Sequence, residues 1–128
     1  MLKIHIFGKS QGCSKCDALK RKVANVLKED AHFREVFGVV LHDLLTEEGI
    51  ADFCETNINP NCVPGLVIGD DAGFLQSRCT SDEWLADGAL LRPWLGLVTD
   101  YGERHRGVIS SEEIRGLLAD ALEIAGKD

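Results

Sequence analysis

Two cysteines, Cys13 and Cys16, are separated by two residues and lie between an apolar run and an amphipathic pattern. As a redox pair, one thiolate attacks a disulfide sulfur and the other resolves the mixed disulfide. As metal ligands, the same two thiolates make half of a typical zinc site. A third interpretation is a pair of inert thiols. The spacing by itself leaves all three open.

The flanking sequence predicts a β-α-β unit that holds this pair at the start of a helix. Residues 2–7 are rich in apolar and β-branched residues and predict a strand. Residues 36–43 predict a second, buried strand. Between them, apolar residues recur from Ser14 onward at the spacing of an amphipathic helix, at Leu19, Val23, Val26 and Leu27. A C-x-x-C pair in a β-α-β unit favours redox chemistry.

The expected position of the pair also favours a reactive thiolate. Cys13 is placed just before the helix and Cys16 in its first turn, where unpaired N–H groups and the helix dipole favour negative charge. Lys9 and Lys15 add positive charge nearby. Such surroundings lower a cysteine pKa from about 8.5 to between about 3.5 and 7.5. We therefore expect Cys13 to be the nucleophile and Cys16 the resolving cysteine.

Further elements follow along the chain. Thr46 is expected to cap a helix at about residues 47–56, with Ile50, Phe53 and Cys54 on its apolar face, so that Cys54 is buried. Residues 65–68 and 73–76 predict a hairpin around the turn sequence GDDAG. His5 and His42 lie on expected strands, and we interpret them as packed or hydrogen-bonded residues.

The last third of the chain is less regular. Thr80 or Ser81 is expected to cap another helix. The segments GLVTD and GVIS predict either two short strands or irregular structure. Ser110 and Glu113 match the capping box of a final helix. Its apolar stripe comprises Ile114, Leu117, Leu118, Ala121, Leu122 and Ala125.

The composition limits the function classes. The chain has 128 residues, 45% of them hydrophobic, and a net charge of −7. An acidic surface disfavours nucleic acid and anionic membranes as partners, and no apolar run reaches the roughly 20 residues of a membrane span. The N-terminus lacks a secretory signal pattern, so we expect a cytoplasmic protein. Five cysteines in a reducing compartment favour redox chemistry, metal binding or free thiols over a disulfide framework.

The chain resembles the thioredoxin-fold superfamily, and most of all its glutaredoxin branch, over residues 1–95. The resemblance rests on the C-x-x-C pair at a helix start and on the sequence VPGLVIGD at residues 63–70. In that family a valine followed by a cis-proline lies beside the active-site pair. The resemblance implies an α/β fold with the order β-α-β-α-β-β-α. Residues 96–128 form an extension that ends in a helix and is expected to pack on the same domain.

The resemblance also implies roles for single residues. Val63 and Pro64 would shape the substrate groove, and Thr80 and Ser81 stand where the family holds the carboxylate of glutathione. Glutathione would then be a co-substrate, with no resident cofactor or metal. The chain departs from the family in having Ser14 and Lys15 where a proline-tyrosine spacer is usual.

The sequence thus predicts a thiol-disulfide oxidoreductase that reduces protein or glutathione mixed disulfides. One alternative is a metal or iron–sulfur carrier in which Cys62 or a second subunit completes the ligands. Another is a partner-binding module without turnover, suggested by the extension. Cys62 and Cys79 are interpreted mainly as packed or exposed thiols.

Overall fold

The structure is a computed structural model that describes residues 2–56, 63–71, 73–74, 90–91, 96–98 and 109–126. In this part the chain has an α/β fold built on one mixed sheet. Within these residues, no helix combines the length and the apolar character that a membrane crossing requires.

The predicted β-α-β unit is confirmed. It consists of strand β1 (Leu2–Gly8), helix α1 (Ser14–Glu29) and strand β2 (Phe37–Asp43). The two strands are parallel, and their register runs from Leu2 opposite Phe37 to Gly8 opposite Asp43. Because the strands are parallel, their carboxyl ends meet at the edge of the sheet where α1 begins. The loop that carries Cys13 therefore lies beside the end of β2.

A short helix, α2 (Ala31–Val36), precedes β2 and was not predicted. Asp30 caps it, since its carboxylate accepts hydrogen bonds from the N–H groups of His32 and Phe33. Phe33 is its buried residue and packs edge-on against Phe37, with ring centroids 6.0 Å apart. Six residues with one buried side chain give no helical periodicity, so only the cap residue signals this helix in the sequence.

The remaining strands extend the sheet on the other side of β1. Strand β3 (Gly65–Asp70) pairs antiparallel with β1, and β4 (Gly73–Phe74) returns beside β3. This confirms the predicted hairpin as far as residue 74; residues 75 and 76 of its second predicted strand lie outside the described residues. Gly73 has φ +127°, a backbone conformation that favours glycine. Strand β6 (Gly96–Val98) pairs with β3 and with β5 (Leu90–Leu91). The resulting strand order is β2-β1-β3-β6-β5, with β4 paired to β3.

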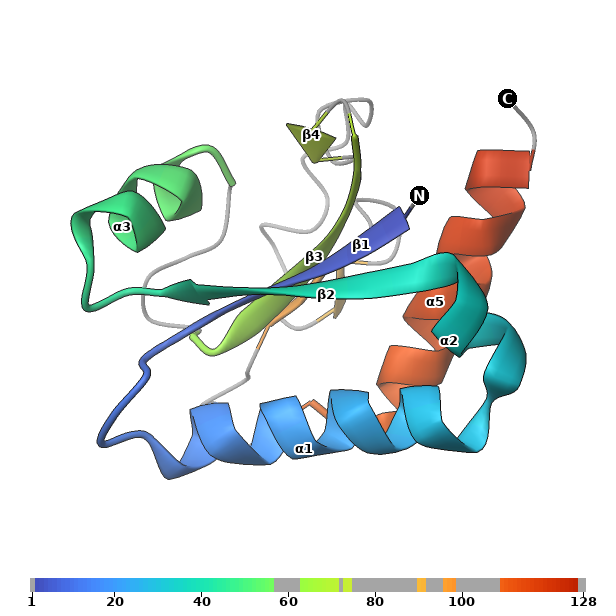
Figure 1. Cartoon of the computed structure of the whole chain (residues 1–128), viewed down its shortest axis with the longest axis horizontal. Helices are drawn as coiled ribbons and strands as arrows, with labels where there is room; N and C mark the ends of the chain where they lie inside the picture. Colours follow the sequence, from blue (N-terminus) through green and yellow to red (C-terminus); the bar gives the residue numbers. More distant parts are fainter. Residues whose placement is uncertain are drawn as a thin grey trace.

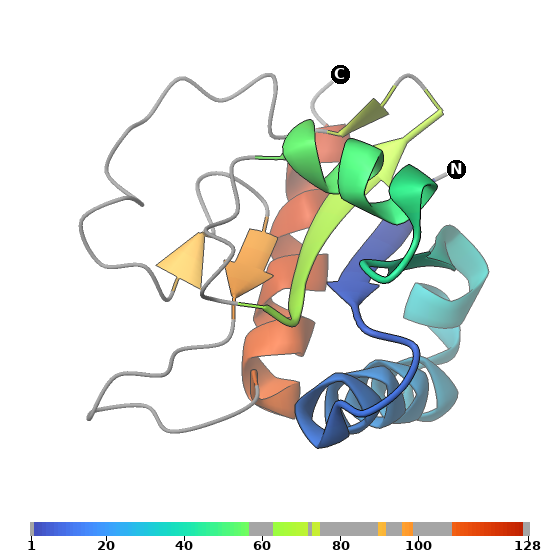
Figure 2. The same cartoon turned by 90° about the vertical axis from the view of Figure 1, so that its left-hand side faces the viewer.

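Helices cover both faces of the sheet (Figure 1). Helix α1 and helix α5 (Ser111–Gly126) pack on one face, and α3 (Glu47–Cys54) lies on the other, as the turned view of Figure 2 also shows. The main core lies between β1, β3, α1 and α5 and includes Ile4, Ile6, Leu19, Val23, Leu66, Ile68, Leu97, Ile114 and Leu117.

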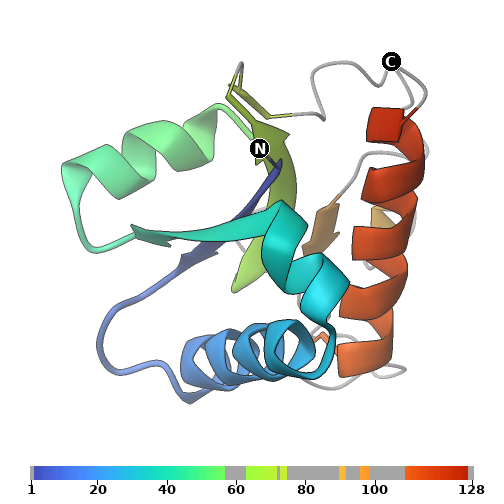
Figure 3. The same ribbon diagram turned by 45° about the vertical axis from the view of Figure 1, so that its right-hand side comes forward.

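Helix α5 joins the core as its apolar stripe predicts. Ile114, Leu117, Leu118 and Ala121 are buried, and Leu122 packs against them. The capping box is formed: the Ser110 hydroxyl accepts from the Glu113 N–H, and the Glu113 carboxylate accepts from the Ser110 N–H. Figure 3 shows α5 beside α1. An ion pair between Arg115 of α5 and Glu29 of α1 joins the two helices. The segment after residue 95 therefore supplies both a strand and a helix to the structure.

Two expectations about burial are wrong. Strand β2 is not a buried strand, because it is the terminal strand of the sheet order; Val39 is 43% and Leu41 58% exposed. Cys54 is exposed rather than buried. Helix α3 turns Gly49 towards the sheet, so the face that carries Ile50 and Cys54 points away from it. The helix expected to begin at Thr80 or Ser81 falls outside the described residues.

Candidate active site

Cys13 and Cys16 form a disulfide at the start of α1. Their Cα atoms are 5.3 Å apart, within the usual range for a disulfide. Cys13 is the N-cap residue, and its sulfur accepts a hydrogen bond of 3.1 Å from the Cys16 N–H. The structure thus places the pair where the sequence predicted, with Cys13 before the helix and Cys16 in its first turn.

The two sulfurs differ in their access to solvent. Cys13 is half-buried, whereas Cys16 is only 1% exposed. A substrate disulfide can reach the outer cysteine, while the inner one is screened by the protein. Cys13 is therefore the more accessible sulfur of the pair, and Cys16 lies behind it.

The two lysines near the pair take different places. Lys9 lies in the loop before Cys13, and its main-chain N–H donates a hydrogen bond of 3.3 Å to the Cys16 sulfur. This contact was not predicted, because sequence reasoning assigned Lys9 a role through its charged side chain, which is exposed. Lys15 lies in the first turn of α1 with its side chain partly exposed.

Pro64 and Gly8 complete the surroundings of Cys16. The Val63–Pro64 peptide bond is cis, as the resemblance implied; Pro64 is buried and Val63 half-buried. A Cβ atom at Gly8 would lie 2.9 Å from the Cys16 sulfur and 3.6 Å from the Pro64 Cβ. Gly8 therefore allows β1, the buried cysteine and the proline to approach one another. Sequence reasoning missed it, although a glycine directly after the apolar run of residues 2–7 and shortly before the cysteines was a usable signal.

Other predicted site residues are not placed. Thr80, Ser81, Cys62 and Cys79 lie outside the described residues. Among the residues that the structure does describe, no three His, Cys, Asp or Glu side chains are grouped closely enough to hold a metal ion.

Asp43, at the end of β2, holds the cysteine loop from the side. Its carboxylate Oδ1 accepts hydrogen bonds from the N–H groups of Ser10, at 3.1 Å, and Leu45, at 2.9 Å. Hydrogen bonds from Ser10 and from the Leu45 N–H lower the pKa of the Asp43 carboxyl. The sequence showed Asp43 only as the end of a strand, because its partner Ser10 is distant along the chain.

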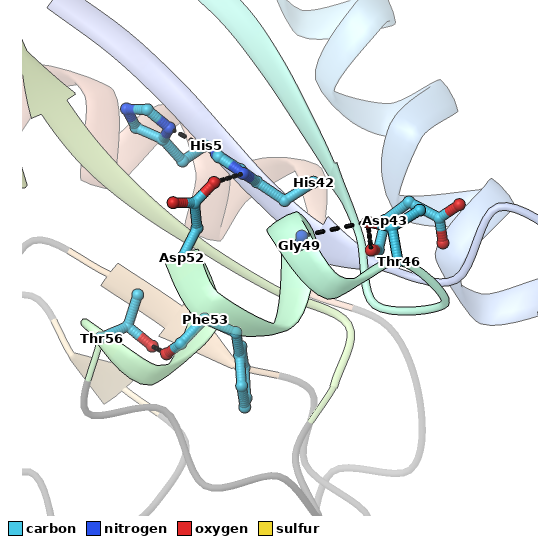
Figure 4. A network of polar contacts seen from close by, with 8 residues as sticks. All are labelled: His5, His42, Asp43, Thr46, Gly49, Asp52, Phe53 and Thr56. Carbon is cyan, nitrogen blue, oxygen red and sulfur yellow. Dashed lines mark hydrogen bonds and ion pairs between the residues drawn. The ribbon is translucent and has the colours of Figure 1, made fainter.

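A second polar cluster joins β1 and β2 to α3 (Figure 4). His5 Nδ1 is 2.8 Å from His42 Nε2, and His42 Nδ1 is 3.2 Å from an oxygen of Asp52. When His42 is neutral and donates from Nδ1 to Asp52, its Nε2 must accept, so His5 donates from Nδ1. The His42 ring also stacks on Phe7, with centroids 4.4 Å apart. Both histidines are therefore hydrogen-bonded structural residues, as interpreted from the sequence.

This cluster predicts a pH dependence of stability. Burial, and then the neighbouring His42, lower the pKa of His5 from 6.5 to about 4. In the unfolded chain the His5 ring therefore binds a proton as the pH falls through about 6.5. In the folded protein it binds that proton only at about pH 4. The contribution of His5 to the free energy of unfolding is fully present above about pH 6.5. It is lost progressively as the pH falls from 6.5 to about 4. We expect a loss of about 1–2 kcal/mol, since water screens the half-buried ring.

The measurement is urea unfolding at pH 7 and pH 4.5 for the wild type and for His5→Asn. Asparagine retains a donor towards His42 and does not titrate. The loss of stability on acidification should be smaller in the variant. Equal losses in both proteins would contradict the assignment to His5.

The site thus comprises the Cys13–Cys16 pair, Pro64, and the main chain of Gly8 and Lys9. Comparisons of the chain with protein-family models, with curated proteins and with solved structures found no match. The interpretation of the site therefore depends on its geometry.

Proposed function

We propose that the protein is a thiol-disulfide oxidoreductase with a thioredoxin-like fold, closest to the glutaredoxin branch. The observation that carries this proposal is the difference between the two cysteines: Cys13 is half-buried at the helix N-cap, and Cys16 is buried behind it. An accessible thiol next to an inaccessible partner suits a two-step exchange with a larger substrate.

The reaction proceeds by two thiolate attacks. The Cys13 thiolate attacks one sulfur of a substrate disulfide, forms a mixed disulfide and releases the other substrate sulfur as a thiolate, which takes up a proton. The Cys16 thiolate then attacks the Cys13 sulfur and releases the second substrate thiol. Two electrons pass to the substrate, and the protein becomes the Cys13–Cys16 disulfide. Two equivalents of an external thiol, or a dithiol reductase, restore the reduced form.

The surroundings of the pair support this function. The helix N-terminus stabilises a thiolate at Cys13, and the Cys16 N–H already donates to that sulfur. The cis Val63–Pro64 bond and the contact region of Gly8, Cys16 and Pro64 are consistent with the groove that the resemblance implies. We propose that Val63 and Pro64 line this groove, and that Thr80, Ser81, Lys9 and Lys15 assist substrate binding.

The test is the reduction of a small disulfide by purified protein with glutathione as the electron donor. Turnover with glutathione supports the glutaredoxin-like form of the proposal. Turnover only with a thioredoxin reductase keeps the oxidoreductase and removes glutathione as donor. If neither donor supports turnover, the proposed activity is wrong, and the metal content of anaerobically purified protein becomes the next measurement.

A further inference from the structure

Asp43 lies beside the loop of residues 9–13, which carries Cys13, and its carboxylate accepts a hydrogen bond from the Ser10 N–H in that loop. We propose that Asp43 is a positioning residue that holds the Lys9 N–H on the Cys16 sulfur and so favours the thiolate that resolves the mixed disulfide. This inference rests on the proposed function and goes beyond it, because it assigns control of the second step to a residue on another strand.

The main chain on both sides of Lys9 is held by hydrogen bonds to Asp43, the last residue of β2, and to Leu44, which follows it. On one side, the Gly8 carbonyl accepts a hydrogen bond of 2.9 Å from the Leu44 N–H. On the other side, the Ser10 N–H donates to the Asp43 carboxylate at 3.1 Å. Lys9 lies between these two anchors, and its own N–H points to the Cys16 sulfur at 3.3 Å. The Lys9 N–H belongs to the same planar peptide group as the Gly8 carbonyl. If the Ser10 anchor is lost, this group is held on its carbonyl side alone and can tilt about the Leu44 hydrogen bond, which moves the N–H away from the sulfur.

The hydrogen bond matters because Cys16 is buried. A thiolate at a residue that is 1% exposed is desolvated, which disfavours the charged form. A hydrogen bond to a charged acceptor is stronger than one to a neutral acceptor. The Lys9 N–H therefore stabilises the Cys16 thiolate more than the thiol or the disulfide sulfur. Since the thiolate performs the second attack, this donor accelerates resolution.

Asp43 is itself held firmly by the turn that leads into α3. Its Oδ1 also accepts from the Leu45 N–H, and its carbonyl accepts from the N–H and the hydroxyl of Thr46. Gly49 packs directly against this carbonyl. Figure 4 shows Asp43, Thr46 and Gly49 together at this junction. The carboxylate thus has a fixed position from which it can orient the cysteine loop.

The test follows the two steps separately with the aromatic disulfide dithionitrobenzoate. Reduced protein releases one thionitrobenzoate when Cys13 attacks and a second when Cys16 resolves the mixed disulfide. The remaining cysteines are replaced by serine, namely Cys54, Cys62 and Cys79. In this background Cys16→Ser should release only the first thionitrobenzoate, and its rate of release measures the attack by Cys13 alone.

We expect Asp43→Ala to slow the second release about tenfold, which corresponds to about 1.4 kcal/mol, and to leave the first release within about twofold. Asp43→Asn retains an oxygen acceptor without the charge and should lie between wild type and alanine. Lys9→Pro removes the donor N–H itself and should also slow the second release. The combined Lys9→Pro and Asp43→Ala variant should be no slower than the slower single variant, since both act through one hydrogen bond.

Two controls separate positioning from general destabilisation. Asp71→Asn removes an exposed carboxylate at the opposite end of β1 and should change neither release. Asp30→Ala removes the cap of α2, at the other end of α1 from the cysteines and outside the contacts of Asp43, and should lower stability without slowing the second release. If Asp43→Ala does not fold, Asp43→Asn and Lys9→Pro decide the question.

The outcomes distinguish this inference from the proposed function. A wild type that never releases the second thionitrobenzoate contradicts the proposed function. A wild type with two releases, together with Asp43 and Lys9 variants whose second release is unchanged, overturns only the role of Asp43. Equal slowing in Asp43→Ala and Asp30→Ala also overturns it, because a purely structural effect would then suffice.

Discussion

Replacing Cys13 by serine is expected to lower the rate of disulfide reduction at least about a thousandfold. A serine hydroxyl does not ionise near neutral pH and cannot form a mixed disulfide, so the first step is lost. Cys13 is the accessible sulfur of the pair and carries the N-cap position. Its loss therefore cannot be replaced by Cys16, which is 1% exposed.

Cys16→Ser should behave differently from Cys13→Ser. The first attack remains possible, so the variant should accumulate a mixed disulfide on Cys13 that mass spectrometry detects. It should retain activity only where a second external thiol can resolve the intermediate. Cys54→Ser is the matched control, since Cys54 is an exposed thiol at the end of α3, and its rate should equal that of the wild type. Retained activity in Cys13→Ser, or a large loss in Cys54→Ser, would contradict the assignment.

Gly49→Ala is expected to destabilise the fold by about 2 kcal/mol or more. A Cβ at this position would overlap the backbone carbonyl of Asp43, and a backbone atom cannot turn aside as a side chain can. Overpacking typically costs about 1–3 kcal/mol, and a clash with backbone atoms that cannot turn aside lies at the upper end of this range or above it. Alanine is favoured over glycine inside a helix by about 1 kcal/mol, so the steric cost exceeds the gain in helix propensity.

Urea unfolding of the wild type and the Gly49 variant measures this effect. The matched control is Glu48→Ala, an exposed position in the same helix, for which we expect a change within about 0.5 kcal/mol. If Gly49→Ala is as stable as the wild type, the close packing of α3 on the end of β2 is wrong. The arrangement that fixes Asp43 would then be in doubt as well.

Local signals were sufficient for the elements around the cysteine pair. The period of the apolar residues between Leu19 and Leu27 predicted α1, and the offset of three residues between Ser110 and Glu113 predicted the cap of α5. Thr46 likewise caps α3 as its type and position suggested. Each of these features depends on residues within one or two turns of each other, so the sequence pattern contains the whole signal.

Long-range contacts explain what the sequence did not predict. The exposure of Val39 and Leu41 follows from the place of β2 at the end of the strand order, which no local pattern encodes. The Asp43 carboxylate accepts a hydrogen bond from the Ser10 N–H. Lys9 contacts the Cys16 sulfur through its main-chain N–H and not through its charged side chain. Gly8 is needed because Cys16 and Pro64 approach it from distant parts of the chain. These relations appear only once the fold brings the segments together.

We expect Cys13 and Cys16 to exchange reversibly between dithiol and disulfide. The direct measurement is a redox titration in buffers with a stepped ratio of reduced to oxidised glutathione, followed by alkylation of free thiols and mass spectrometry of the peptide that contains both cysteines. We predict one reversible two-electron transition that links Cys13 to Cys16 and is unchanged by Cys54→Ser. A pair that stays reduced across the whole series, or that oxidises only to disulfides with other cysteines, would contradict the account.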